Sequence, residues 1–275
     1  MEKTKLIKTG VILIILAILV ITAFLVKSKT TPAIHKTEKN LIELDSPLND
    51  NSFYYFKKAP KDNNTKITII VIPGGAYAGL ATRMLEVVGN LLTDNGINVL
   101  FFYYKVPEQF DYDNFPLYDL QNLIKLARKN SKKWDIDPDK IGLFGFSAGG
   151  HLSAMASVYF DKTSRPDFVI LISPAIAIFR DNSFDPSKII SPKINQESFV
   201  KYMSPELHIS NNTPVTYISH AKGDKIIHTQ HILKYTEKLK EKNIPYKLKV
   251  FSEGEHCIYD HEDIINWVKE INNIK

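Results

Sequence analysis

Short apolar runs alternate with helical patterns along most of the chain, and this alternation constrains the fold more than any other feature of the sequence. Strands are predicted at 66–72, 97–104, 140–146, 168–172, 215–219 and 246–251, and helices at 84–95, 117–134, 148–158, 229–242 and 262–271. Strands separated by helices of ten or more residues indicate a mostly parallel sheet covered on both faces. The strands lack polar–apolar alternation, as burial on both faces requires. The predicted fold class is therefore α/β.

Size and composition fit one large domain. The chain has 275 residues, of which 44% are hydrophobic and one is cysteine. This length can bury a core without disulfides, and a single cysteine excludes an internal disulfide or a multi-cysteine zinc site. We expect residues 48–275 to form one catalytic domain. Residues 175–213 are the least periodic part, and we expect a loop or small cap there.

The positive charge is confined to the N-terminal segment. The net charge is +5, and residues 1–40 hold seven Lys and two Glu, which alone gives +5. The remaining 235 residues therefore balance 28 basic against 28 acidic groups. Nucleic-acid binding needs a basic face on the folded domain, so no nucleic-acid partner is expected.

A membrane segment is predicted near the N-terminus. Val11–Val26 is a sixteen-residue run in which only Thr22 is polar, and lysines flank it on both sides. Residues 10–26 approach the length that crosses a bilayer. They follow a short basic segment at 1–9 and precede a polar tether at 27–47. The run lacks a good small-residue cleavage site, which favours an uncleaved anchor over a cleaved signal peptide. Its uniform apolarity and its flanking lysines argue against a buried helix of the domain. We expect a single-pass membrane protein with its domain outside the cytoplasm, or a secreted protein if the segment is cleaved.

The nucleophile candidate is Ser147. It lies in Gly145-Phe146-Ser147-Ala148-Gly149, a G-x-S-x-G motif between a predicted strand and a helix. In this motif, known as a nucleophile elbow, the serine occupies a strained turn between the strand and the helix. The residues two before and two after it must therefore be small. The alternative is a glycine-rich turn without chemistry, but the correct flanking elements favour a nucleophile.

Serine needs a base, and the base needs an orienting acid. His256 follows the strand 246–251 in a polar loop, and Asp224 follows the strand 215–219. Both should lie at the carboxyl edge of the sheet, where open α/β folds bind ligands. Glu253 and Glu255 are nearer to His256 in sequence, but they share its loop, which makes Asp224 the better acid candidate.

The other downstream histidines are assigned no chemistry. His228 and His231 have the spacing of a metal pair, but without a third ligand nearby a solvated helix face is the better interpretation. His220 ends a strand and is expected to be structural, and His261 begins the last helix. No metal site is predicted.

The oxyanion of an acyl-transfer reaction needs N–H donors. One candidate is the backbone of Ala148, next to the nucleophile. The others are Gly75 and Ala76 in Pro73-Gly74-Gly75-Ala76-Tyr77, which follows the strand 66–72. Taken alone, this segment indicates only a turn. Together with the G-x-S-x-G motif at Ser147, it predicts an oxyanion loop.

With these motifs in place, the sequence resembles α/β-hydrolase esterases of the acetylxylan-esterase and BD-FAE-like group, which are related to the hormone-sensitive-lipase esterases. The resemblance runs through residues 66–261 and is most specific in the stretch WDIDPDKIGLFGFSAGGHL, with PGGAY before it and HAKGDKIIH and GEH after it. It implies an α/β-hydrolase fold and the same roles for Ser147, Asp224 and His256.

Four positions depart from the pattern of that group. Ala76 replaces a glycine of the oxyanion loop, Lys105 an arginine, Gly223 an aspartate, and Cys257 the glycine after the catalytic histidine. None of these changes removes a member of the triad.

The predicted function is hydrolysis of carboxylic esters without a cofactor. The resemblance implies short acyl groups, such as acetyl groups on carbohydrates, so the expected partner is a small-molecule or glycan ester. A serine peptidase or amidase on the same fold is one alternative, because a triad does not specify the leaving group. A non-catalytic, membrane-tethered binding protein is the other.

Overall fold

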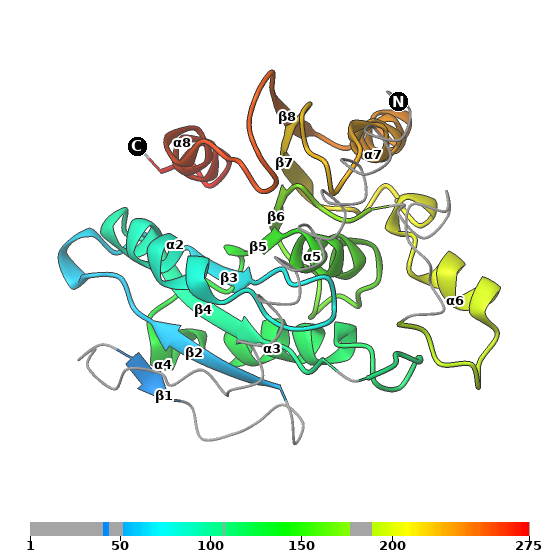
Figure 1. Ribbon diagram of the computed structural model, residues 1–275. Coiled ribbons are helices and arrows are strands. Elements are labelled where there is room, and N and C mark those ends of the chain that lie inside the picture. Colours follow the sequence, from blue (N-terminus) through cyan, green and yellow to red (C-terminus); the bar gives the residue numbers. More distant parts are fainter. Residues whose placement is uncertain (1–40, 44–51, 107, 177–188, 275) are drawn as a thin grey trace, which may run out of the picture. The chain divides into compact units, whose positions relative to one another are not determined.

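The computed structural model describes residues 41–43, 52–106, 108–176 and 189–274 (Figure 1). Its strands are β1 (Leu41–Glu43), β2 (Phe53–Lys57), β3 (Thr68–Ile72), β4 (Asn98–Tyr103), β5 (Ile141–Phe146), β6 (Phe168–Ile172), β7 (Val215–Ala221) and β8 (Tyr246–Phe251). Its α-helices are α2 (Arg83–Asp94), α3 (Leu117–Lys129), α4 (Ser131–Trp134), α5 (Ala148–Val158), α6 (Gln196–Tyr202), α7 (Thr229–Glu241) and α8 (His261–Ile271). Two short 3₁₀ helices are η2 (Lys61–Asn63) and η4 (Pro205–Leu207).

The described strands form one eight-stranded sheet in the order β1-β2-β4-β3-β5-β6-β7-β8. From β4 to β8 every neighbouring pair is parallel, whereas β1 pairs with β2, and β2 with β4, in antiparallel fashion. The carboxyl ends of β3, β5, β6, β7 and β8 therefore share one edge. The loops after these strands carry the predicted site residues, so the topology brings those loops together.

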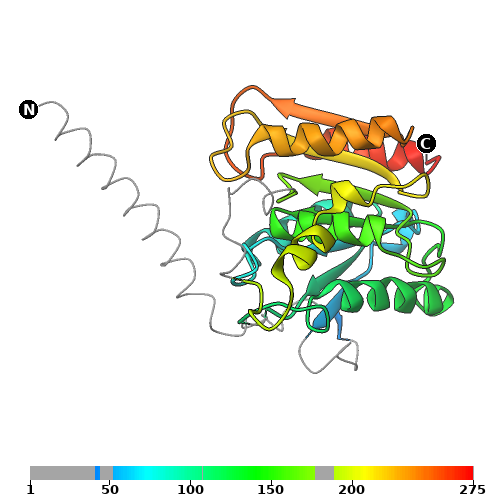
Figure 2. The ribbon, with the colours of Figure 1, turned by 90° about the vertical axis from the view of Figure 1, so that its right-hand side faces the viewer.

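Each central strand contributes alternate residues to two separate cores. On one face Ile70, Leu143 and Leu171 pack with residues of α3, α5 and α7. On the other face Val71 and Phe144 pack with residues of α2 and α8. Figures 1 and 2 show the same arrangement, with α3, α5 and α7 on one side of the sheet and α2 and α8 on the other. Successive strand residues point to opposite faces, so a wholly apolar strand fits only a sheet that is covered twice.

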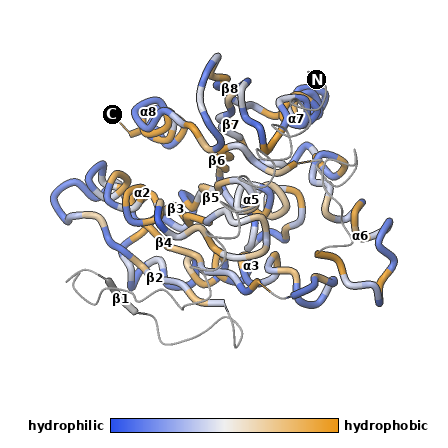
Figure 3. The backbone as a smooth tube through the Cα atoms, viewed as in Figure 1, coloured by the Kyte–Doolittle hydropathy of each residue, from blue (hydrophilic) through white to orange (hydrophobic). Residues whose placement is uncertain are grey.

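The covering helices are amphipathic, except for α5. In Figure 3 the tubes of α2, α7 and α8 carry both hydrophilic and hydrophobic residues. Helix α5 is buried from Ala148 to Ser157, which explains its run of small residues next to the sheet. The most enclosed helix is thus the one that follows the predicted nucleophile.

Most of the predicted elements are confirmed, with shifts at their ends. The helix predicted over 117–134 is wrong in one respect, because it is divided into α3 and α4 at Asn130, whose φ of −93° and ψ of 8° leave the helical region. The strand predicted over 215–219 continues to Ala221. Strands β1 and β2 were not predicted, and β1 falls within the range 27–47 interpreted as a tether. Both lie on the antiparallel side of the sheet, and β2 alternates half-buried with buried residues.

The predicted membrane segment at 10–26 lies outside the described residues. Within the part of the chain that is described, no helix combines the length and the hydrophobicity needed to cross a bilayer.

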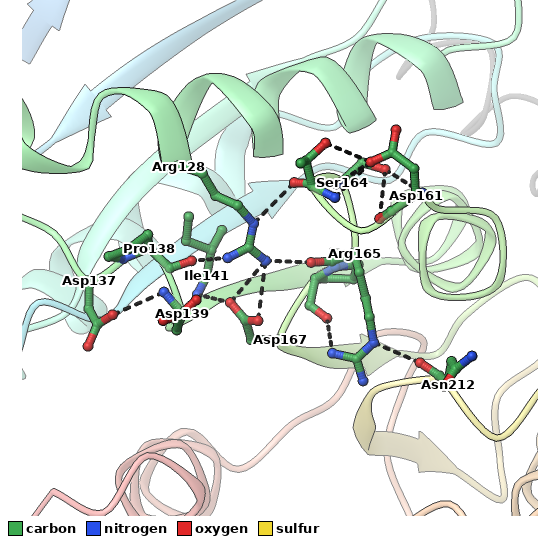
Figure 4. A network of polar contacts seen from close by, with 12 residues as sticks. Arg128, Asp137, Pro138, Asp139, Ile141, Asp161, Ser164, Arg165, Asp167 and Asn212 are labelled. Carbon is green, nitrogen blue, oxygen red and sulfur yellow. Dashed lines mark hydrogen bonds and ion pairs between the residues drawn. The ribbon is translucent and has the colours of Figure 1, made fainter.

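A polar network closes the amino-terminal edge of the sheet, opposite the predicted site (Figure 4). Arg128, at the end of α3, donates two hydrogen bonds of 3.2 Å to the carboxylate of Asp167, which directly precedes β6. Its guanidinium also donates to the carbonyl oxygens of Pro138, Thr163 and Arg165. Asp167 in turn accepts a 2.8 Å bond from the N–H of Ile141 at the start of β5. This network links α3 to the beginnings of two central strands.

Candidate active site

Ser147 lies in a strained turn between β5 and α5. Its φ of 51° and ψ of −114° fall outside the regions that L-residues ordinarily occupy. A Cβ atom on Gly145 would lie 2.2 Å from the carbonyl oxygen of Gly149, and one on Gly149 would lie 2.4 Å from the carbonyl oxygen of Ile72. Both glycines of the motif are therefore required sterically. Strain that the surrounding structure maintains at a serine is typical of a functional position.

The predicted oxyanion loop lies against this turn. A Cβ atom on Gly74 would lie 2.9 Å from the carbonyl oxygen of Phe146, so the two backbones are in contact. The φ angles of Gly75, Ala76 and Tyr77 are 133°, 55° and 57°, so three successive residues are left-handed. Ala148 is buried as the first residue of α5. The structure thus brings the segment containing Gly75 and Ala76 to the helix start that contains Ala148.

Asp224 and His256 form a direct pair. Nδ1 of His256 lies 2.8 Å from Oδ2 of Asp224, and the histidine side chain is 19% exposed whereas the aspartate side chain is fully buried. The other carboxylate oxygen, Oδ1, accepts hydrogen bonds from the N–H groups of Ile226 and Ile227 at 2.9 and 3.0 Å. Glu253 and Glu255 are exposed. Of the acids considered from the sequence, Asp224 is the one that contacts His256.

The hydrogen bonds determine the charge of Asp224. Burial favours its protonated form, but the bonds from His256 and from the N–H groups of Ile227 and Ile226 outweigh burial and lower the pKa of Asp224 to about 2. The carboxylate is therefore ionised at neutral pH and can stabilise a positive charge on His256.

Two serines at the ends of neighbouring strands hold the loop of His256. The N–H of Cys257 donates to Oγ of Ser173 at 3.1 Å, and Oγ of Ser219 donates to the carbonyl oxygen of Ile258 at 2.7 Å. Ser173 directly follows β6, whose last residue, Ile172, accepts a 2.9 Å bond from the N–H of Ser147. The end of β6 therefore supports both the nucleophile candidate and the base candidate.

The hydrogen bond between Ser147 and His256 that would complete a catalytic triad is not formed in the structure. Within residues 52–106, 108–176 and 189–274, His256 has no hydrogen bond to Ser147, and its Nε2 atom has no partner. Nδ1 is engaged by Asp224, so Nε2 is the ring atom left to take a proton. Such bonds are often long or absent without substrate and shorten when substrate binds.

The remaining histidines differ in part from expectation. His231 is fully buried, so the interpretation of a solvated helix face is wrong for it, although His228 is exposed. His231 lies on the inner face of α7 with Ile232 and Tyr235, whereas His228 is the N-cap residue before the helix. Among the described residues no group of three or more His, Cys, Asp or Glu side chains could hold a metal. His220 is fully buried, and its Nδ1 lies 3.8 Å from Oδ2 of Asp224. Burial lowers the pKa of His220, so it remains neutral beside the acid.

Sequence reasoning missed two residues near the site. The hydroxyl of Tyr77 lies 2.7 Å from Nδ1 of His151, and Nε2 of His151 lies 2.7 Å from the carbonyl oxygen of Met203. Both side chains belong to quoted motifs, PGGAY and SAGGHL, yet only the small residues of those motifs were assigned roles. The signal that could have found them is His151 itself, a polar residue at a buried position of α5 among small and apolar side chains.

The family was identified by comparison with known proteins. Residues 112–273, more than half of the chain, match the model of the prolyl oligopeptidase family, Peptidase_S9. The chain belongs to the prolyl oligopeptidase family. The matched range includes Ser147, Asp224 and His256 and begins after the predicted oxyanion loop.

Two individual proteins are similar to this chain over a longer stretch than the family match. The chain is 26% identical over 243 residues to endo-1,4-β-xylanase B of Butyrivibrio fibrisolvens, which covers 82% of this chain and 38% of the xylanase. It is also 26% identical over 228 residues to an acetylxylan esterase of Xylanibacter ruminicola, which covers 76% of this chain and 47% of the esterase. The chain thus spans less than half the length of either relative.

A solved structure matches over nearly all of the body. The acetyl ester-xyloside bifunctional hydrolase from Caldicellulosiruptor lactoaceticus superimposes with a TM-score of 0.74 at 27% identity, and the match covers 87% of this chain and 95% of that one. The predicted α/β-hydrolase fold and the predicted resemblance to the acetylxylan-esterase group are therefore confirmed.

Proposed function

We propose that this protein is a serine carboxylesterase that hydrolyses short-acyl esters, principally acetyl esters of carbohydrates. The observation that carries the proposal is a strained serine at the carboxyl end of β5 on the same edge as a His256–Asp224 pair. Two of the similar proteins are named an acetylxylan esterase and an acetyl ester-xyloside bifunctional hydrolase, which supports an ester-bond hydrolase. No cofactor takes part in the proposed reaction.

In the proposed mechanism Oγ of Ser147 attacks the ester carbonyl while Nε2 of His256 takes its proton. The carboxylate of Asp224 holds the imidazolium by its 2.8 Å bond. The N–H groups of Gly75 or Ala76 and of Ala148 donate to the oxyanion. The tetrahedral intermediate collapses, and His256 returns the proton to the leaving alcohol. Water, activated by His256, then hydrolyses the acyl-serine and regenerates the enzyme.

A fluorophosphonate probe tests the nucleophile. The probe should label the wild-type protein and leave Ser147→Ala unlabelled, because the probe phosphonylates an activated serine. Absence of labelling in the wild-type protein, or labelling that survives in Ser147→Ala, would contradict the proposal. Ser157→Ala is a matched control, since Ser157 is a buried serine at the far end of α5, bonds to the carbonyl oxygen of Ala154 and should not affect labelling.

A series of aryl esters from acetyl to octanoyl tests the acyl group. The proposal predicts the highest kcat/KM with acetyl or propionyl esters, followed by release of acetate from acetylated xylan or cello-oligosaccharides. A maximum at octanoyl would reject the short-acyl assignment while leaving the esterase assignment intact.

The second candidate function is a serine peptidase or amidase, and the match to the prolyl oligopeptidase family favours it. Both activities use the same triad chemistry and differ in the leaving group that His256 must protonate. Proline-containing aminoacyl anilides distinguish the two: turnover of an anilide with a kcat/KM above that of the aryl acetate would replace the esterase by a peptidase. A wild-type protein that turns over neither would indicate the third possibility, a binding protein.

We further propose that residues 10–26 anchor the domain in a cell membrane with the domain outside the cytoplasm. The support is the apolar run with flanking lysines. Fractionation of cells expressing the full chain and a variant lacking residues 1–26 tests it. The full chain should sediment with membranes and the variant should not.

A further inference from the structure

His151 is fully buried one helical turn after Ser147 and is fixed through both ring nitrogens. A carbonyl oxygen only accepts, so the 2.7 Å contact to Met203 requires a hydrogen on Nε2 of His151. In a neutral ring Nδ1 is then an acceptor, and the hydroxyl of Tyr77 donates to it. Burial lowers the pKa of His151 to about 4, which agrees with a neutral ring at neutral pH.

Tyr77 is the last residue of the strained loop Pro73–Tyr77. Gly75, Ala76 and Tyr77 have successive positive φ angles, which ordinary L-residues hold only when the surroundings impose them. The ring of Tyr77 is buried and packs edge-on against Phe110 and His151, with ring centroids 5.3 and 5.7 Å apart. At the start of the loop, the hydroxyl of Tyr104 donates to the carbonyl oxygen of Pro73 at 3.1 Å. A buried tyrosine hydroxyl thus holds each end of the loop.

The two sets of oxyanion donors come from different segments. Gly75 and Ala76 belong to the loop after β3, and Ala148 begins α5. Their spacing must be kept within about 0.5 Å for both to reach one oxygen atom. The bond between Tyr77 and His151 connects the loop directly to α5, and the bond from His151 to Met203 extends the connection to the end of α6.

We propose that His151 is a positioning residue that, through Tyr77, sets the distance between the two halves of the oxyanion hole. This inference rests on the proposed function. His151 does not contact the reacting atoms, and its effect is transmitted by the loop.

The primary test is Tyr77→Phe, which deletes one oxygen atom and keeps the buried ring. With the ester that the wild-type protein hydrolyses best, kcat should fall about tenfold while KM changes less than twofold, because oxyanion donors act on the transition state. Tyr217→Phe is the matched control, since it deletes another hydroxyl with a 2.7 Å bond, to Asp263, away from the loop. The kcat of this control variant should stay within twofold of the wild-type value.

Two substitutions of His151 separate its bonds. Asn presents an oxygen near the position of Nδ1 and can still accept from Tyr77, whereas Gln presents its amide near Nε2 and can keep only the bond to Met203. The proposal predicts that His151→Gln loses as much kcat as Tyr77→Phe and that His151→Asn keeps most of the wild-type kcat. It also predicts that the kcat of the double variant, Tyr77→Phe with His151→Gln, lies within twofold of that of the less active single variant. Equal losses in His151→Asn and His151→Gln would overturn the proposal, since a merely structural histidine predicts that result.

A boronic acid that forms a tetrahedral adduct with Ser147 gives the specific readout. Its Ki should rise in Tyr77→Phe in proportion to the loss of kcat, whereas a non-reactive ester analogue should bind unchanged. An unchanged kcat and Ki in Tyr77→Phe, with an active wild-type protein, would reject the role of His151 alone. A wild-type protein without hydrolytic activity would reject the proposed function instead.

Discussion

Two polar clusters lie at opposite edges of the same sheet, and each is built around an aspartate and a nitrogen base. At the amino edge Arg128 uses its guanidinium for Asp167 and for three backbone carbonyls. At the carboxyl edge His256 uses Nδ1 for Asp224, while its Nε2 has no partner in the described part of the chain. A guanidinium only donates hydrogen bonds, whereas an unpartnered imidazole nitrogen can also accept one.

The difference distinguishes the structural cluster at the amino edge from the candidate catalytic cluster at the carboxyl edge. At the amino edge each guanidinium nitrogen of Arg128 donates to a protein oxygen atom, so the cluster holds α3, β5 and β6 together. At the carboxyl edge Nε2 of His256 has no partner among the described residues, and it is the atom that takes the proton of Ser147 in the proposed mechanism. The same comparison predicts that amino-edge substitutions affect stability and carboxyl-edge substitutions affect turnover.

The largest expected effect is that of Asp224→Asn. The amide removes the negative charge and favours the wrong tautomer of His256, so kcat should fall by about 10³- to 10⁴-fold. The equivalent substitution Asp167→Asn should leave kcat within about twofold, because no reacting atom is near the amino edge. Steady-state kinetics on both variants checks this, and a comparable loss of kcat in Asp167→Asn would erase the distinction between the two edges.

The next largest effect is a loss of stability in mild acid that originates at the carboxyl edge. The unfolded chain protonates His151 near its ordinary pKa of 6.5, whereas burial lowers the pKa in the folded protein to about 4. Between these values the unfolded state binds more protons, so stability falls as the pH falls, by at most about 3 kcal/mol. Urea unfolding from pH 7 to 4 measures this slope.

The His151→Gln variant is the control for that slope. It cannot titrate, so its free energy of unfolding should depend less on pH in the same window, even though its stability at pH 7 is lower. The pairing of Asp224 acts at lower pH, because its contribution is complete above about 4 and is lost as the pH falls through about 2. Identical slopes in the wild-type protein and His151→Gln would assign the acid sensitivity to other groups.

The third prediction concerns Arg128→Met, which keeps the length of the side chain and removes every donor. The carbonyl oxygens of Pro138, Thr163 and Arg165 and the carboxylate of Asp167 lose their partner. The cluster is partly exposed, so water replaces some of these bonds, and we expect a loss of about 2 kcal/mol of unfolding free energy. The kcat of the folded variant should stay within about twofold. A large loss of kcat with unchanged stability would contradict the structural role.

The sequence predicted the carboxyl edge far better than the amino edge, for physical reasons. Ser147, Asp224 and His256 follow strand ends, and their chemistry restricts the residue types around them, so position and composition indicate the site together. Arg128 and Asp167 look like ordinary surface charges in the sequence, because any helix end and any strand start can carry them. Strands β1 and β2 were missed since they pair antiparallel at one side of the sheet and have no helix between them. His151 and Tyr77 were missed because their roles depend on a contact across 74 residues of sequence.

The smallest expected effect is that of Cys257→Gly, next to the base candidate. Cys257 has a φ of 67°, a left-handed conformation that costs an L-residue about 1 kcal/mol and a glycine almost nothing. Cys257 is half-buried, and burial and the charge of Asp224 raise the pKa of its thiol to about 12, so it stays protonated and unreactive at neutral pH. Relief of strain and loss of the buried sulfur oppose one another, so the free energy of unfolding should change by less than about 1 kcal/mol. The kcat should remain within about twofold, because the N–H of residue 257 still donates to Ser173. A tenfold loss of kcat would mean that the thiol itself positions the nucleophile turn. The proposed activity would then depend on side-chain packing at the carboxyl edge as well as on the unpartnered Nε2 atom of His256.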